Sequence, residues 1–377
     1  MRVLIIALVF AVNLAYADDF IGFSAYENGD YPTALQQLTP SANKGNDEAM
    51  YVLGRMYQYG LGVNKDLKQA LYWYRKSADK NNPLSQLNLG FLYDAGEGVP
   101  QDYAQAFAWY MKSATQGNAV AQRNVGLMFA TGDGIQTNAN DAFNWFKKSA
   151  DQGYSKAQVN LGYAYMMGFG TAKDLDQALN WYEKAAQQGD EKGQYSLGLL
   201  YTGRYGIPAD QKAATYWLTQ AANQGHVNAQ AYLGYQYLNG LGTEQSAEKA
   251  AFWFQTAAQK DNAFAQAQLG QLFLAGNGID KDYEKAAFWF TKAAEVGNVM
   301  AEGKLGYLYA GGLGVTKDNV KAYAWLKLAE QNQNEQASKD LQRLQSQLTA
   351  AEKQQGEALL QVLSKQVAAN AHDDDEQ

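Results

Sequence analysis

Apolar residues recur at helical spacing along most of the chain and predict pairs of amphipathic helices. Between residues 48 and 58, Ala49, Leu53 and Tyr57 stand four positions apart, so they form an apolar stripe on one helix face. The glycine-rich stretch that follows, residues 59–63, predicts a tight turn, because glycine adopts positive φ without a steric penalty.

A second helix is predicted from residue 67 to residue 80. Asp66, just before it, has a side-chain oxygen that can accept hydrogen bonds from the free N–H groups at a helix start. Ala70, Trp73 and Ala78 lie at helical spacing on its predicted inward face. The segment therefore predicts a helix-turn-helix unit with a small apolar interface.

This unit repeats with a period of 36 residues. All eight tryptophans obey that spacing: Trp73, Trp109, Trp145, Trp181, Trp217, Trp253, Trp289 and Trp325. Gly54 in the first helix also recurs in every copy, up to Gly306. A glycine inside a helix costs roughly 1 kcal/mol relative to alanine, so its repetition predicts that a helix or an aromatic ring packs against the bare backbone.

The recurring pattern is A-x-x-x-L-G-x-x-Y-x-x-G-x-G-V-x-x-D-x-x-x-A-x-x-W-Y-x-K-A-A-x-x-G, and it resembles the Sel1-like repeat, a relative of the tetratricopeptide repeat. The resemblance covers about residues 46–330. It implies an all-α fold, a right-handed α-solenoid of eight 36-residue repeats. It also implies a scaffold or adaptor function, in some secreted bacterial members through contact with host cells.

The two ends of the array differ from the repeat. Residues 18–45 contain a partial unit, and residues 331–370 predict capping helices that cover the exposed edge of the core. Residues 371–377 form an acidic tail that we expect to be disordered.

The first 17 residues have the pattern of a secretory leader. Arg2 precedes an apolar run, and Ala15-Tyr16-Ala17 matches the small-x-small motif of a signal-peptidase site. We therefore expect an exported protein, periplasmic or secreted. No second long apolar stretch occurs, so no integral membrane segment is expected after cleavage.

Composition narrows the possible functions. The chain has no cysteine, only two histidines and a net charge of −7, which argue against metal sites, cofactors and nucleic-acid partners. The zero cysteines also separate it from a disulfide-stapled branch of the family that is linked to β-lactam binding. Since no cluster of acid, base and nucleophile emerges, we predict that the protein is not an enzyme.

The strictly repeated residues are explained as core, turns and caps, so a functional site is expected where the repeats differ. Next to the core stripe of the first helices lies a second face that carries amides and aromatic rings. Its candidate partner-binding residues are Asn88, Phe91, Asn124, Asn160, Tyr163, Tyr232, Tyr235, Gln268 and Tyr307. Such side chains suit adaptable recognition of a protein or peptide in a concave groove.

Two alternatives for this face stay open: bonds between neighbouring repeats, or binding of a glycan or peptidoglycan fragment. A ladder of lysines near the ends of the second helices also has two interpretations. These residues are Lys76, Lys112, Lys148, Lys184 and Lys292. They either interact favourably with the helix C-termini or bind an anionic partner.

Overall fold

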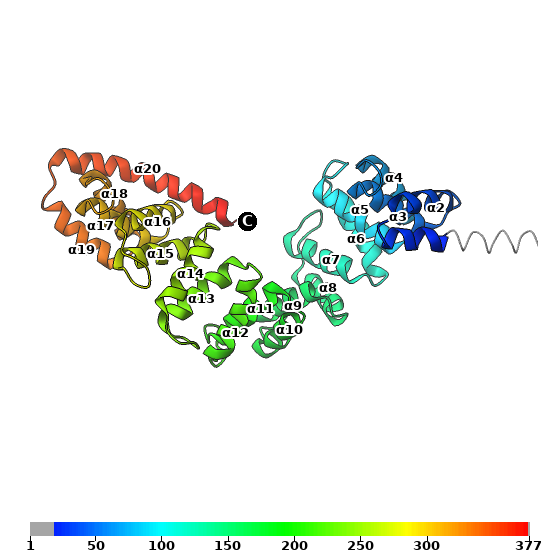
Figure 1. Cartoon of the computed structure of the whole chain (residues 1–377), viewed down its shortest axis with the longest axis horizontal. Coiled ribbons are helices and arrows are strands. Elements are labelled where there is room, and N and C mark those ends of the chain that lie inside the picture. Colours follow the sequence, from blue (N-terminus) through cyan, green and yellow to red (C-terminus); the bar gives the residue numbers. More distant parts are fainter. Residues whose placement is uncertain (1–18, 376–377) are drawn as a thin grey trace, which may run out of the picture. The chain divides into compact units, whose positions relative to one another are not determined.

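The computed structural model describes residues 19–375, with side chains described as far as residue 370 (Figure 1). The expected leader, residues 1–17, and the last two residues of the acidic tail lie outside the described residues. All regular structure within 19–375 is helical. The chain forms two compact units, which we call unit 1 (described from residue 19 to 188) and unit 2 (residues 189–375).

Unit 1 contains a helical segment at residues 19–27 and then nine helices. These are α2 (Tyr31–Asn43), α3 (Asp47–Tyr59), α4 (Leu67–Ala78), α5 (Pro83–Ala95), α6 (Tyr103–Thr115), α7 (Ala119–Thr131), α8 (Ala139–Asp151), α9 (Ser155–Met167) and α10 (Leu175–Gln187). Unit 2 contains α11 (Glu191–Tyr201), α12 (Gln211–Asn223), α13 (Val227–Asn239), α14 (Ala247–Ala258), α15 (Ala263–Ala275), α16 (Tyr283–Glu295), α17 (Val299–Gly311), α18 (Asn319–Gln331), α19 (Glu335–Gln345) and α20 (Ala350–Asp375).

The helices pair as the 36-residue period predicts. In each repeat the first helix, here the A helix, packs against the second, the B helix, and each B helix packs against the next A helix of its unit. The A helices are the odd-numbered helices from α3 to α17, and the B helices are the even-numbered helices from α4 to α18. The expected all-α solenoid of eight repeats is therefore confirmed.

The glycine inside each A helix packs against a side chain of its own B helix, as the sequence predicted. A Cβ atom added to Gly162 would lie 2.8 Å from the ring of Tyr182, which is 1% exposed. The same contact joins Gly234 to Phe254 and Gly306 to Leu326. The absence of a side chain therefore lets the A and B helices approach closely.

The predicted inward position of the tryptophan is confirmed at Trp73, which is 7% exposed, but the tryptophans do not fill the most deeply buried position of the B helix. The residue after each tryptophan, such as Tyr182 or Phe254, fills the fully buried position against the glycine. Most of the tryptophans are only half-buried at the B-helix surface. The lysine ladder packs on them: the Nζ atoms of Lys112, Lys148 and Lys184 lie 3.8–3.9 Å from the ring centroids of the tryptophans one turn earlier. Cation–π contact thus occupies these three lysines.

Helix ends follow the expected capping chemistry. Asp66 and its equivalents cap the B helices, and for example Asp174 Oδ1 accepts from the Gln177 N–H at 2.9 Å. The A helices carry caps that the sequence interpretation did not identify, mostly asparagines such as Asn118 and Asn262. Each cap satisfies an N–H group that the first helical turn leaves free.

The C-terminal helices pack on the last repeat. Both α19 and α20 contact α18, and α20 also contacts α16 (Figure 1). Leu360 of α20 is buried, and the Tyr323 hydroxyl of α18 donates to Glu357 Oε1 at 2.6 Å. Near its end, Asn370 Nδ2 donates to the Glu295 carbonyl at 2.9 Å. The helix continues to Asp375, five residues past the predicted boundary at residue 370.

A ladder of buried glutamines links successive repeats. In unit 1, Gln122 Nε2 donates to the Ala114 carbonyl at 3.1 Å, while its Oε1 accepts from Gln152 Nε2 at 2.7 Å. In unit 2 this position holds Gln194, Gln230 and Gln266 and, in the last repeat, Glu302. Its Oε2 accepts from Asn332 at 3.2 Å, but its buried Oε1 has no partner among the described residues. Burial raises the pKa of the Glu302 carboxyl group.

Glu302→Gln should stabilise unit 2 at neutral pH, because the amide restores the N–H donor that the other repeats use. The expected gain is about 1 kcal/mol, typical of one hydrogen bond. Because the pKa of Glu302 is raised on folding, its protonated form stabilises the fold at acid pH, and this contribution is lost as pH rises through the folded pKa. Urea unfolding of parent and variant should therefore differ at pH 7 and converge near pH 4. An equal difference at both pH values would contradict this explanation.

Candidate functional site

In unit 1 the aromatic rings of the predicted recognition face are exposed, whereas two of its amides already form hydrogen bonds within the protein. Phe91 and Tyr163 project to solvent. Asn160 Oδ1 accepts from Arg123 Nε, one repeat earlier, at 3.0 Å. Asn124 is buried and hydrogen-bonded to the Tyr110 hydroxyl, again one repeat earlier. These two amides thus join neighbouring repeats, which is the first of the alternatives raised by the sequence.

Asn88 completes the unit 1 set and is half-buried. In unit 2, Tyr232 and Tyr235 line one pocket, while Tyr307 lines a separate, smaller cavity of about 300 Å³. Gln268, on α15 between them in sequence, is half-buried and lines neither of the two. The structure therefore brings Tyr232 and Tyr235 together in one concave site.

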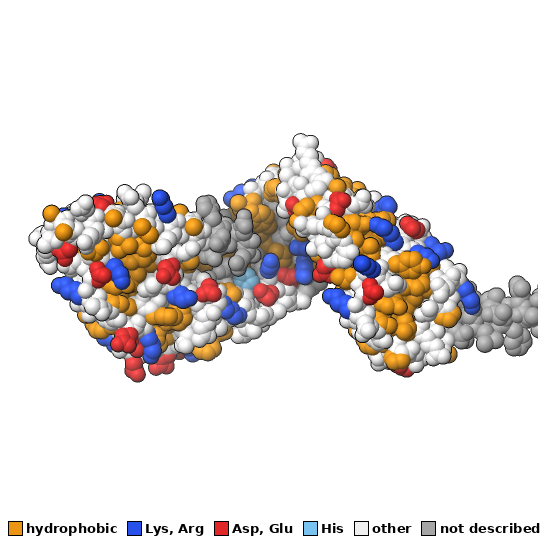
Figure 2. Space-filling view, turned by 90° about the horizontal axis from the view of Figure 1, so that it is seen from above, with side chains coloured by type: hydrophobic (Ala, Val, Ile, Leu, Met, Phe, Trp, Pro, Cys, Tyr) orange, Lys and Arg blue, Asp and Glu red, His pale blue; other side chains and the backbone are white. Residues whose placement is uncertain are grey.

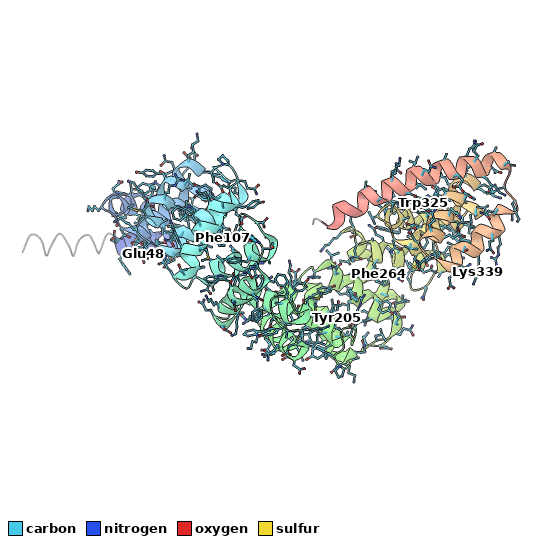
Figure 3. All side chains as sticks on the ribbon, turned by 180° about the vertical axis from the view of Figure 1, so that it is seen from behind. Glu48, Phe107, Tyr205, Phe264, Trp325 and Lys339 are labelled. Atoms are coloured by element: carbon cyan, nitrogen blue, oxygen red, sulfur yellow. The ribbon has the colours of Figure 1, made fainter. Side chains whose placement is uncertain are left out.

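This pocket, which we call the α13 pocket, has a volume of about 560 Å³. Its walls come from α13, from the loops before α12 and after α13, and from the start of α15. The principal lining side chains are Arg204, Tyr232, Tyr235, Gln236, Leu241 and Phe264. Figure 3 labels Phe264 on α15 and also Tyr205, the neighbour of Arg204 in the loop before α12. The volume is within the range of preformed small-ligand sites.

Aromatic rings form one side of the α13 pocket. Tyr232 and Tyr235 stand on α13, and the Tyr235 and Phe264 ring centroids are 6.3 Å apart in a tilted arrangement. Asn228 and Asn262 lie beside them and bond to each other, since Asn262 Nδ2 donates to Asn228 Oδ1 at 2.9 Å. Amides and rings therefore adjoin here in the combination that the sequence predicted for recognition.

Arg204 supplies the charge of the α13 pocket. It lies in the loop between α11 and α12, and its Nη1 donates to the Tyr232 hydroxyl at 2.8 Å. Among the residues that line the pocket, it alone carries a charge. It forms no ion pair within the described part of the chain. The rim of the pocket is consequently positive.

Gln236 supplies an unusual polar group at the wall. Its side chain is on the A helix, is 2% exposed and lines the pocket. Its Oε1 atom has no hydrogen-bond partner among the described residues. A buried carbonyl oxygen without a donor costs about 1–3 kcal/mol, so this residue is retained at the expense of stability.

Arg204 and Gln236 both differ from the residues at the same position in the other repeats. This difference is the signal that the sequence interpretation missed. At the position of Arg204 the other seven repeats have a turn glycine: Gly60, Gly96, Gly132, Gly168, Gly240, Gly276 and Gly312. At the position of Gln236 they have apolar residues, all buried: Met56, Leu92, Met128, Ala164, Leu200, Leu272 and Leu308. The polar departures thus coincide with a cavity of about 560 Å³ on the predicted face.

A third departure, Thr215 on α12, braces the floor of the site. Its hydroxyl has one hydrogen, which it shares between two carbonyl oxygens, that of Gln211 at 2.9 Å and that of Leu241 at 3.0 Å. Gln211 Nε2 donates in turn to the Thr202 carbonyl at 3.2 Å. These bonds tie the loop after α13 to α12 and to the loop that carries Arg204, so the pocket is formed before any partner binds.

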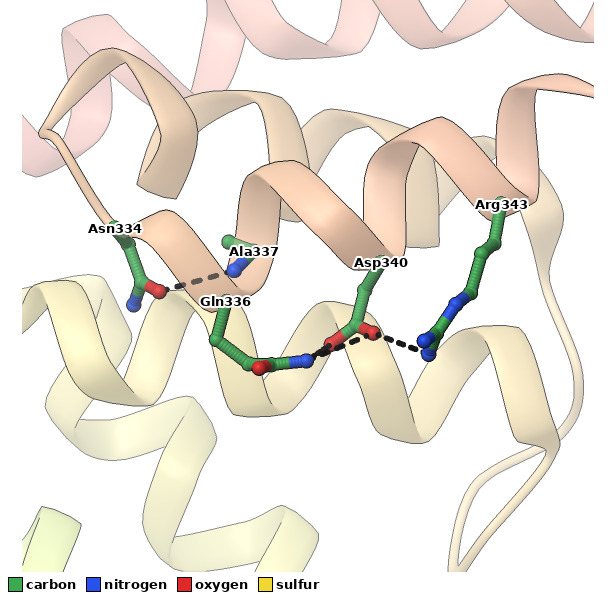
Figure 4. A network of polar contacts seen from close by, with 5 residues as sticks. All are labelled: Asn334, Gln336, Ala337, Asp340 and Arg343. Carbon is green, nitrogen blue, oxygen red and sulfur yellow. Dashed lines mark hydrogen bonds and ion pairs between the residues drawn. The ribbon is translucent and has the colours of Figure 1, made fainter.

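The smaller cavity at Tyr307 differs in its electrostatics. There Asp340 of α19 accepts from Gln336 at 3.1 Å and pairs with Arg343 at 3.4 Å (Figure 4). Its arginine is therefore already neutralised by a carboxylate of the same helix. Arg204 of the α13 pocket has no such partner in the described residues, which makes it the better candidate for a ligand contact.

His226 has a structural role at the start of α13. Its Nδ1 accepts from the Ala229 N–H at 3.2 Å, and its ring stacks on Tyr195 at 4.2 Å. Burial, together with Lys192, lowers the pKa of the imidazole to about 4. A neutral ring at physiological pH is the form that can accept the capping hydrogen bond.

Metal-ligand clusters and membrane-spanning helices are both absent from the described residues. Within residues 19–375, no three His, Cys, Asp or Glu side chains gather as metal ligands. A search of the same region finds no helix long and apolar enough to cross a membrane. On the face drawn in Figure 2, acidic and basic side chains are intermingled and not separated into patches of one sign.

Comparison with known proteins places the fold. The sequence model described as Sel1 repeat matches residues 47–82, 83–118, 119–154, 155–190, 192–226, 227–262, 263–298 and 299–334. A crystal structure of c5321, a protective antigen of uropathogenic Escherichia coli with an SLR fold, is 34% identical. It aligns over 96% of this chain and 86% of that chain, with a TM-score of 0.56.

A Sel1 repeat protein from Oxalobacter formigenes is 32% identical over 82% of this chain and 90% of that chain, with a TM-score of 0.60. A search of the curated proteins gives no match. The matched repeats begin at α3 and end just after α18, and each contains one A helix and one B helix.

Proposed function

We propose that this chain, which belongs to the Sel1 repeat family, is an exported, non-enzymatic scaffold. It binds a protein partner at the α13 pocket. The Sel1 repeat fold is typical of protein–protein interaction scaffolds. The observation that carries the proposal is the coincidence of a preformed cavity with the polar departures Arg204 and Gln236.

The composition of the pocket supports a protein partner. Tyrosine and arginine are enriched among the residues that dominate binding energy at protein interfaces. Tyr232, Tyr235 and Arg204 are held by α13 and by a braced loop, so little conformational entropy is lost when a segment docks. An extended peptide that inserts one or two side chains matches a cavity of about 560 Å³.

Export and host contact belong to the same proposal. The leader pattern of residues 1–17 supports transfer across the inner membrane of a bacterium. The similar c5321 protein is described as a protective antigen, which is consistent with exposure of such proteins to a host. We therefore propose that this chain acts in the periplasm or outside the cell, and a host protein is a partner to test first.

The test is affinity capture with the chain from residue 18 and two matched double variants. One variant carries Tyr232→Ala and Tyr235→Ala in the α13 pocket, and the other carries Phe91→Ala and Tyr163→Ala on the equivalent face of unit 1. We expect the parent and the unit 1 variant to retain the same partner and the pocket variant to lose it. Circular dichroism checks that all three chains are folded.

Capture that survives in the pocket variant would move the site elsewhere on the protein. Binding of soluble saccharides, with no protein captured by the parent, would favour the glycan alternative for the same rings and amides. In that case the face of Tyr235 would stack on a sugar and the Asn228–Asn262 pair would bond to its hydroxyls.

A further inference from the structure

We infer that the α13 pocket recognises an acidic side chain of an extended peptide, together with a backbone N–H group next to it. The inference rests on the proposed function and adds the chemistry of the partner. Arg204 would bind the carboxylate, and Gln236 would accept from the N–H group.

Arg204 gives the α13 pocket a group that binds anions. A guanidinium donates from several N–H groups in a planar fork, which matches the two oxygens of a carboxylate. One of its nitrogens is directed by the bond to the Tyr232 hydroxyl, 2.8 Å away. Because no carboxylate lines the pocket, a ligand anion does not compete with an acidic side chain of the protein.

The second requirement comes from Gln236. Its Oε1 has almost no exposed surface and no donor in the described structure, so the amide would turn toward the cavity to accept from an N–H or O–H group of a ligand. A fully ionised phosphate or acetate has none. A peptide supplies a donor at every residue except proline and can therefore satisfy Arg204 and Gln236 together.

The remaining walls suit the body of a peptide residue. Ala231, Leu241 and Phe264 present apolar surface between the two polar groups. The methylene stem of an acidic residue, or an apolar neighbour in the peptide, would cover that surface and displace water from it. Recognition would thus combine one charge, one hydrogen bond and apolar burial.

The charge pattern also limits how acidic the partner is. A single arginine lines the pocket, and the chain as a whole carries a net charge of −7. A polyanion would be repelled by the acidic remainder of the protein, whereas one carboxylate at the rim would not. The geometry therefore points to an isolated acidic residue and not to an acidic run.

The test uses a phage-displayed library of random dodecapeptides, selected on the chain from residue 18. We expect the selected peptides to share one acidic residue. A synthetic selected peptide should bind at least about tenfold more weakly when that residue is changed to its amide, as expected for a lost charge-assisted bond. Arg204→Gln should cause a similar loss and Arg204→Lys a smaller one, while Lys212→Gln, an exposed cation outside the pocket, should have no effect.

The outcomes separate the inference from the proposed function. If selected peptides lose binding with Tyr232→Ala and Tyr235→Ala but share no acidic residue, or ignore Arg204→Gln, the acidic-residue inference is wrong and the scaffold proposal stands. If no peptide is selected, or if selected peptides bind the tyrosine variant normally, peptide binding at the α13 pocket is overturned as well.

Discussion

Gly162→Val is expected to destabilise unit 1 by about 1–3 kcal/mol, a typical cost of overpacking a core. The new Cβ would lie 2.8 Å from the ring of Tyr182, closer than real contacts allow. That ring is 1% exposed and has little room to move. Helix propensity alone would make valine equal to or slightly better than glycine, so packing and propensity predict opposite signs. Urea unfolding followed by circular dichroism measures the difference.

The matched control is Lys156→Val, which places the same β-branched residue at an exposed position of the same helix, α9. It should change the free energy of unfolding by no more than about 0.5 kcal/mol. Adding Tyr182→Ala to Gly162→Val should cost less than the sum of the two single changes, because the smaller side chain makes room for valine. A neutral Gly162→Val variant would show that the glycines are not close-contact sites.

Most of this fold can be predicted from the sequence, because eight copies of one pattern agree where a single copy would leave the helix bounds ambiguous. Eight copies of one pattern define the helix pairs, the turn glycines and the B-helix caps, and all three are confirmed. Asn81 and Asp261 stand where the repeat pattern has its last glycine, and both have positive φ, which Asn and Asp adopt more readily than most residues. The glycine in the A helix is confirmed as a close-contact position for the same reason.

It was harder to predict which large side chain of the B helix packs against the glycine of the A helix. Trp181 and Tyr182 are adjacent large side chains, and either of them would complete an apolar stripe at helical spacing. The structure buries Tyr182 fully against Gly162 and places the Trp181 indole under Lys184, at 3.9 Å from Nζ. Both rings are buried, and the space beside the bare glycine backbone decides which of them packs against it, which sequence spacing does not show.

Part of the pocket that we propose as the binding site could be predicted from the sequence. Tyr232 and Tyr235 were identified from the helical face that they share. Arg204 and Gln236 were not, because one lies in a turn and the other at a core position of the helix. A comparison of each repeat with the other seven would have identified both, since each is the single polar side chain at its position in the repeat. Their meeting at one cavity is a property of the folded repeat.

Gln236→Leu is expected to stabilise unit 2 and at the same time to weaken peptide binding. Leucine is the residue that occupies the equivalent buried position at Leu200 and Leu272, so it fits the local packing. Removing a buried oxygen without a donor should raise the free energy of unfolding by roughly 1–3 kcal/mol. The same change removes the acceptor for the N–H group of the ligand and should lower affinity about fivefold or more.

A purely structural glutamine would behave in the opposite way. If an interaction within the fold satisfied Oε1, leucine would destabilise unit 2 and leave the pocket rim unchanged. Leu272→Gln in the next repeat is the matched reverse change: it introduces a buried amide away from the α13 pocket, so it should destabilise the protein without affecting peptide binding.

The most direct test of the central claim is an isothermal titration of one selected acidic peptide into the parent chain and into Gln236→Leu. We expect weaker binding by the variant, even though it unfolds at a higher urea concentration than the parent. Equal affinity in the two titrations would contradict the claim that the α13 pocket, with its exceptional glutamine, is the recognition site of this protein.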